Sequence, residues 1–155
     1  SCPAGCGKST TFRHIFTKFK IEYPFKWVSY IELKEHTETL EKFKNNSDLN
    51  LAKVTKFLAE EILNLTSFNM EIFIDLFYKD KVVLLWDGVD EVSGTYLEIT
   101  STIFSSIMLT TNNTQWISTR PQYRETLQNE LNTTSYELTA YNEKNRKEFF
   151  EKCLG

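Results

Sequence analysis

Small residues stand immediately before a lysine and a serine at the start of the chain, in the segment SCPAGCGKST. Ala4, Gly5 and Gly7 allow consecutive backbone N–H groups to turn inward and surround a polyphosphate. Lys8 would then reach the β and γ phosphates, and Ser9 supplies the hydroxyl expected on Mg²⁺. The helix that follows would point its positive end at the bound anion. We therefore predict a phosphate-binding loop whose candidate residues are Ala4, Gly5, Cys6, Gly7, Lys8, Ser9 and Thr10.

This loop constrains the fold, because a phosphate loop joins the end of a hydrophobic strand to the start of a helix. The chain has no residue before Ser1 to form that strand, so we expect a domain truncated at its N-terminal strand. The pattern G-x-x-x-x-G-K-[ST] also requires a glycine where the chain has Cys2. The alternative interpretation is a glycine-rich turn that happens to precede a helix.

A second motif, KVVLLWDGVDE, combines an apolar run with acids at its end. The continuous apolar residues 82–86 predict a parallel strand that is buried on both faces. Asp87 at the strand tip is where a phosphate-loop protein needs a carboxylate for Mg²⁺, and Gly88 permits a sharp turn. Asp90 or Glu91 could orient an attacking water, and by position we assign the base to Glu91. Alternatively, these two acids cap the next helix in solvent.

The third motif, TQWISTRP, predicts a short strand with polar residues at its end. Pro121 cannot continue a regular strand, so it leaves Arg120 at the strand tip. The planar, permanently charged guanidinium group of Arg120 suits a bidentate contact to the γ phosphate. Together with Asp90 and Glu91, Arg120 completes the candidate catalytic residues, while Ser9 and Asp87 are the candidate Mg²⁺ ligands.

The order GCGKST, VVLLWDGVDEV, TQWISTRP resembles the NACHT domain, the signalling NTPase module of the STAND class. Residues 27–33 look like the second strand of that family, and residues 136–138 with the helix containing Phe149 and Phe150 look like its closing strand and helix. The resemblance implies an α/β, three-layer P-loop NTPase fold with a parallel sheet. Residues 1–155 would form a partial domain without the launching strand and the C-terminal winged-helix region.

The same resemblance implies a function. It indicates binding of ATP or GTP with Mg²⁺, with ATP the first choice, and slow hydrolysis that acts as a conformational switch. It further implies homo- or hetero-oligomerisation through the full-length protein in signal transduction and innate immunity. The alternative is a scaffold module that binds nucleotide without hydrolysing it.

Composition agrees with one globular domain, since the 155 residues are 41% hydrophobic. The net charge of −3, with lysines interspersed among acids, argues against direct nucleic-acid binding. No apolar run approaches membrane-spanning length. Three cysteines, two of them in the phosphate loop, fit a reducing compartment, so we expect a cytoplasmic location.

Apolar spacing predicts helices between the strands. One begins after the phosphate loop and buries Phe12, Ile15, Phe16 and Phe19, and others cover residues 51–65, 68–78 and 96–108. Residues 35–50 are charged and lack a clear period, so we expect a surface insertion or a short helix over the nucleotide side. The family's sheet order places the launching strand between the arginine strand and the closing strand, which predicts four strands flanking an empty slot.

Overall fold

The computed structural model describes residues 7–44, 50–92 and 94–137. Helices and strands of this part of the chain follow the order α1 (Lys8–Glu22), β1 (Trp27–Glu32), α2 (Thr37–Lys44), α3 (Leu51–Phe57), α4 (Ser67–Tyr78), β2 (Val82–Asp87), α5 (Gly94–Thr110), β3 (Thr114–Ile117) and α6 (Arg124–Leu131). Short 3₁₀ turns cover Leu33–His36, Val89–Glu91 and Pro121–Tyr123, and a π-helical turn covers Leu58–Ile62. Strands therefore alternate with helices, as the sequence predicts.

The three strands form one parallel sheet in the order β1-β2-β3. Glu32 at the end of β1 pairs in register with Asp87, and Ile117 at the end of β3 pairs with Trp86. The carboxyl ends of all three strands consequently meet at one edge of the sheet. This edge positions the polar residues that follow each strand.

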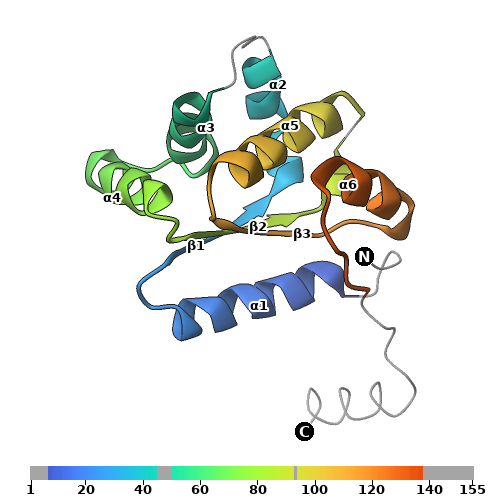
Figure 1. The fold of residues 1–155 in the computed structure, drawn as a ribbon, viewed down its shortest axis with the longest axis horizontal. Coiled ribbons are helices and arrows are strands. Elements are labelled where there is room, and N and C mark those ends of the chain that lie inside the picture. Colours follow the sequence, from blue (N-terminus) through green and yellow to red (C-terminus); the bar gives the residue numbers. More distant parts are fainter. Residues whose placement is uncertain (1–6, 45–49, 93, 138–155) are drawn as a thin grey trace, which may run out of the picture.

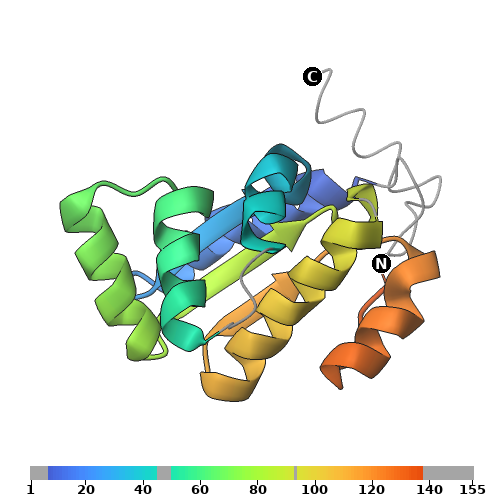
Figure 2. The same cartoon turned by 90° about the horizontal axis from the view of Figure 1, so that it is seen from above.

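Helices cover both faces of the sheet, which gives the three layers expected of this α/β fold (Figures 1 and 2). Helix α1 packs on one face, where Phe12 joins Val83 and Leu85 in a small apolar cluster. The other face carries the larger cluster, to which β2 contributes Val82, Leu84 and Trp86. Successive side chains of a strand point to opposite faces. Both faces of β2 are buried, which explains its uninterrupted apolar run.

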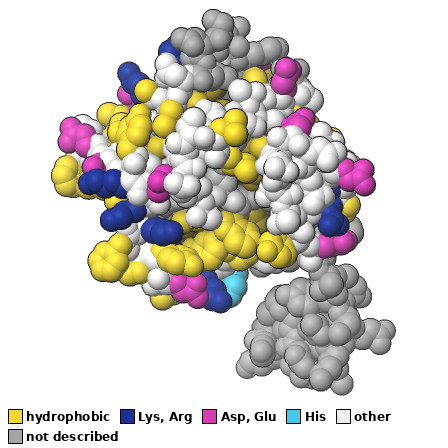
Figure 3. Space-filling view, viewed as in Figure 1, with side chains coloured by type: hydrophobic (Ala, Val, Ile, Leu, Met, Phe, Trp, Pro, Cys, Tyr) yellow, Lys and Arg dark blue, Asp and Glu magenta, His cyan; other side chains and the backbone are white. Residues whose placement is uncertain are grey.

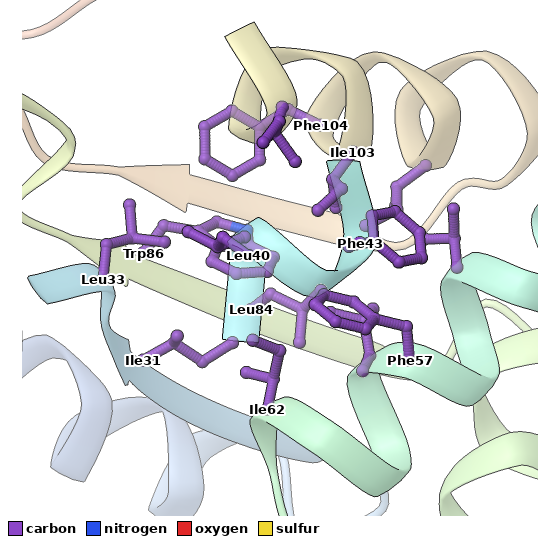
Figure 4. Close-up of a cluster of buried hydrophobic side chains, with 14 of the residues drawn as sticks. Ile31, Leu33, Leu40, Phe43, Phe57, Ile62, Leu84, Trp86, Ile103 and Phe104 are labelled. Carbon is purple, nitrogen blue, oxygen red and sulfur yellow. The ribbon is translucent and has the colours of Figure 1, made fainter. Parts of the chain in front are cut away.

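Helix α2 corrects the expectation for the first part of residues 35–50, and residues 45–49 of that segment lie outside the described residues. It is a short helix, one of the two alternatives, but it is not a surface feature, because Leu40 and Phe43 lie in the larger core (Figure 4). The Phe43 ring stacks on Phe57 of α3 with 4.0 Å between the ring centroids. The segment has few apolar residues, so the sequence pattern did not predict the burial of Leu40 and Phe43.

The other helices agree closely with the sequence pattern. Ile15, Phe16 and Phe19 of α1 pack beside Phe12 as expected. The helix expected over residues 51–65 comprises α3 and the π-helical turn that follows it. Ile103 and Ile107 of α5 are buried, whereas Met108 is exposed.

Only three of the four expected strands occur in the described part of the chain. Tyr136 and Glu137 have no strand conformation, and the remainder of the expected closing strand and helix lies outside the described residues. No helix in the described ranges combines the length and apolar character needed to cross a bilayer.

Figure 3 shows hydrophobic side chains on the lower part of the molecule, where α1 lies. Exposed apolar residues at the end of α1 and in the loop before β1 are Ile21, Tyr23 and Phe25. They lie away from the N-terminus of α1, at which Lys8 begins the helix.

Candidate functional site

Asp87 is the central acid of the site at the carboxyl edge of the sheet, and it is only 4% exposed. Its Oδ2 accepts a hydrogen bond from the Tyr30 hydroxyl at 2.6 Å, and its Oδ1 accepts one from Ser118 Oγ. Burial by itself would raise the pKa of this carboxyl group, but hydrogen bonds from Ser118, Ser9 and Tyr30 oppose that effect. Together with the charge of Lys8, they hold the pKa of Asp87 below its ordinary value.

Tyr30 brings its hydroxyl to Asp87 from the neighbouring strand β1. Burial, followed by the hydrogen bond to Asp87, raises the pKa of Tyr30 to about 12. The phenol therefore stays protonated near neutral pH and acts as a donor to the ionised carboxylate.

Ser118 fixes the turn that follows Asp87. Its Oγ accepts a hydrogen bond from the Gly88 N–H at 3.0 Å, and its carbonyl accepts one from the Val89 N–H at 3.2 Å. Gly88 has a φ of 80°, a left-handed conformation that side chains other than glycine rarely adopt. The glycine predicted to permit a sharp exit from β2 therefore does so here.

Asp90 lies between the two cations of the site, although its partner Lys8 is 82 residues away in sequence. Its Oδ1 is 2.5 Å from Lys8 Nζ, and its Oδ2 is 2.9 Å from Arg120 Nε. The Arg120 contact is an ion pair without hydrogen-bond geometry. The Asp90 side chain is fully buried, which makes it a bridge between α1 and the segment after β3.

Glu91, which the sequence suggests as the base, lies on the outside of the same turn. Its side chain is exposed and folds back over Gly88, where an added Cβ would be 3.2 Å from Glu91 Cδ. The structure thus brings Lys8, Asp90 and Arg120 together and leaves Glu91 beside this group rather than within it.

The predicted phosphate loop is described from Gly7 onward, and Ala4, Gly5 and Cys6 lie outside the described residues. Gly7 precedes α1 with a φ of 82°, and its carbonyl accepts the Thr11 N–H at 2.8 Å. Lys8 is mostly buried by its contact with Asp90, whereas Thr10 is exposed. The N-terminus of α1 therefore faces the acids at the sheet edge.

A cavity of about 460 Å³ follows the outer edge of β3 and reaches Lys8 at one end. Its walls include Phe12 of α1 and Leu127 of α6. Thr119 also lines it, and the buried Thr119 Oγ1 has no hydrogen-bond partner among the described residues.

Ser9 and Asp87 fit a magnesium ion. A hydroxyl hydrogen-bonded to an ionised carboxylate provides the hard oxygen donors that Mg²⁺ prefers. Within the described ranges, no three His, Cys, Asp or Glu residues cluster as a metal cage.

Sequence reasoning missed Tyr30 and Ser118 as parts of the site. Tyr30 lies two residues before the end of β1, and Ser118 directly follows β3, so each carries a hydroxyl near the carboxyl end of a strand that the sequence predicts. Hydroxyl side chains near the carboxyl ends of predicted parallel strands could have identified both residues, because the carboxyl ends of neighbouring parallel strands meet at one edge of the sheet.

A parallel α/β sheet with a lysine and a serine at the start of a helix, facing a strand-tip carboxylate, defines the class of P-loop NTPases. The family model described as NACHT domain matches residues 2–155, and the chain belongs to this family. Neither a curated protein nor a solved structure matches the chain. Membership of the family makes this a nucleotide-binding domain of the NTPase type.

Proposed function

We propose that this domain binds ATP, or alternatively GTP, together with Mg²⁺ and hydrolyses it slowly as a conformational switch for signalling. The observation that carries the proposal is the convergence of Lys8, Asp87 and Arg120 at the carboxyl edge of the sheet. A phosphate chain placed there would meet a lysine, an arginine and a helix N-terminus. When bound, Mg²⁺ would neutralise part of the phosphate charge.

The Asp90 bridge supports the switch. Asp90 already neutralises Lys8 and contacts Arg120, so phosphates must compete with its carboxylate for both cations. Nucleotide binding would therefore loosen the link between α1 and the segment after β3. Loss of the γ phosphate would favour re-formation of the Asp90 contacts with Lys8 and Arg120. The nucleotide state would therefore be coupled to the relative positions of α1 and the segment after β3.

Oligomerisation is the expected output of such a switch. Ile21 and Phe25 are 76% and 85% exposed; Ile21 lies in the last turn of α1, remote from Lys8, and Phe25 lies in the loop that follows. Apolar side chains of this exposure are available for contact with another protein.

The second candidate is a nucleotide-binding scaffold that does not hydrolyse. The position of Glu91 favours it, because the side chain is exposed and folded over Gly88. For hydrolysis, Glu91 would have to turn toward the γ phosphate when nucleotide is bound. A scaffold requires no such movement.

Binding and single-turnover hydrolysis of ATP by the full-length protein separate these candidates. We expect Lys8→Ala to abolish binding, whereas Lys18→Ala on the same helix, whose exposed lysine pairs with Glu22 at 3.6 Å, should bind normally. Glu91→Gln should keep binding and lose about 100-fold or more in hydrolysis rate, as expected for removal of a general base. Wild-type protein that binds ATP without turnover would favour the scaffold, and equal binding by wild type and Lys8→Ala would contradict both candidates.

A further inference from the structure

Tyr30 is a polar exception within the apolar cluster between α1 and the sheet. Its ring packs beside Phe16 of α1, with 6.0 Å between the ring centroids. The guanidinium group of Arg13, one turn earlier on α1, lies 5.5 Å from the centre of the Tyr30 ring. Two side chains of α1 therefore fix the direction in which the phenol points.

Arg13 is itself held in place. It forms an ion pair with Glu32, which lies two residues after Tyr30 on β1. Lys34 adds a second cation 3.4 Å from Glu32. The guanidinium group is thus tethered to the same strand whose tyrosine ring it covers.

The hydroxyl of Tyr30 and that of Ser118 reach Asp87 from opposite neighbouring strands. Tyr30 donates to Oδ2 at 2.6 Å, and Ser118 donates to Oδ1. One donor on each oxygen fixes the plane of the carboxylate. A carboxylate oxygen has two lone-pair directions, so these two bonds leave room on Asp87 for the Ser9 hydroxyl and for a metal ion or a water.

We propose that Tyr30 is a positioning residue, whose hydroxyl holds the Asp87 carboxylate in the orientation that binds Mg²⁺–nucleotide. The inference rests on the proposed function. It also gives α1 a second connection to the metal site besides Ser9, because Arg13 and Phe16 of α1 hold the Tyr30 ring. A carboxylate that turns freely about its side-chain bonds loses conformational entropy when it binds a metal ion. A carboxylate held at both oxygens has lost that entropy on folding, so it binds the ion more tightly. Partners in this position typically change metal affinity by about 10–100-fold.

Tyr30→Phe tests the inference, because it removes one oxygen and leaves the ring to pack against Arg13 and Phe16. Tyr96→Phe is the matched control. Tyr96 also donates to a carboxylate at 2.6 Å, that of Glu41, but this pair lies between α5 and α2, away from the site.

Two affinities of the full-length protein are measured. The first is the Mg²⁺ dissociation constant at a fixed, saturating ATP concentration, obtained by titration with Mn²⁺ as a paramagnetic probe that Mg²⁺ displaces. The second is the ATP dissociation constant in EDTA. We expect Tyr30→Phe to weaken Mg²⁺ binding by about tenfold and to leave metal-free ATP binding unchanged. Tyr96→Phe should change neither affinity.

An unchanged Mg²⁺ affinity in Tyr30→Phe would overturn the inference while the proposed function stands. Equal losses of Mg²⁺ affinity and metal-free ATP affinity would also overturn it, since they would indicate a packing defect. If wild type binds neither ATP nor metal, the proposed function fails first and the inference falls with it.

A second variant keeps the test decisive if Tyr30→Phe does not fold. Arg13→Met removes the charge over the ring and leaves the Tyr30 hydroxyl in place, and Arg13 is 65% exposed, so folding should tolerate the change. We expect a few-fold loss of Mg²⁺ affinity from Arg13→Met with metal-free ATP affinity unchanged. Wild-type Mg²⁺ affinity in Arg13→Met would contradict the inference that Arg13 of α1 holds Tyr30 in position for Asp87.

Discussion

Replacement of Asp90 by asparagine should destabilise the nucleotide-free protein and increase its response to nucleotide. The Asp90 side chain is fully buried between Lys8 and Arg120, and asparagine has the same shape without the charge. In the variant, the Lys8 ammonium would remain in the site without its anion. Bound phosphates would supply the missing negative charge.

The structure sets the size of this effect. Removal of one partner from a buried ion pair typically costs about 3–5 kcal/mol, because the other charge is left uncompensated. Lys8 is 13% exposed and must bear most of that penalty, whereas Arg120 is 44% exposed and can be rehydrated. We therefore expect the lower end of the range, about 3 kcal/mol. For a domain of this length, that lowers Tm by about 6–12 °C.

Thermal and urea unfolding of the full-length protein, with and without Mg²⁺–ATP, provide the assay. Asp75→Asn is the control, because Asp75 pairs with Lys79 at 2.8 Å but both side chains are 58% exposed. An exposed pair of this kind contributes about 0.2–1 kcal/mol at most. Asp90→Asn should be far less stable than Asp75→Asn without nucleotide, and saturating ATP should narrow the difference. Equal stability of the two variants without nucleotide would refute the reasoning.

Three further results follow from the packing and the charges. Phe43→Ala should cost about 3–5 kcal/mol in urea unfolding, because the ring is 4% exposed and stacks on Phe57, and a cost below about 1 kcal/mol would place α2 outside the core. Gly88→Ala should cost about 1–2 kcal/mol, since residue 88 has a φ of 80°, and wild-type stability would contradict this conformation. The pKa of Asp87 is lowered from 3.8 on folding, so its ionisation stabilises the protein above that pH and ceases to do so as the pH falls through the lowered value. Asp87→Asn should therefore be less stable than wild type at pH 7, and a difference that does not shrink in acid would contradict the assignment.

The strands and helices are well predicted from the sequence, because each one depends on the pattern of apolar residues within its own segment. The apolar run of β2 is typical of a strand that is buried on both faces of a parallel sheet covered by helices, and the structure has this arrangement. The helix after the phosphate loop has apolar residues at helical spacing, and they pack on the sheet as expected. Helix α2 escaped prediction as a core element because only Leu40 and Phe43 anchor it.

The site is less predictable, because its contacts join distant segments. Tyr30 and Asp87 are 57 residues apart, and they meet only through the register of β1 on β2. The pairing of Asp90 with Lys8 depends on the turn at Gly88 and on where α1 begins, neither of which a motif specifies. The motifs identified Lys8, Asp87, Asp90 and Arg120, whereas Tyr30 and Ser118 and the pairing of all these residues became visible only in the fold.

The central claim is that the carboxyl edge of the sheet binds a nucleotide through Lys8. The most direct test is thermal melting of the full-length protein with Mg²⁺ and ATP, GTP or ADP, for wild type beside Lys8→Ala and Lys18→Ala. A ligand at about a hundredfold its Kd stabilises by about 2.7 kcal/mol, which corresponds to a rise in Tm of about 5–10 °C. The account predicts this rise in wild type and Lys18→Ala and its loss in Lys8→Ala. No rise with any nucleotide, or the same rise in Lys8→Ala, would contradict it.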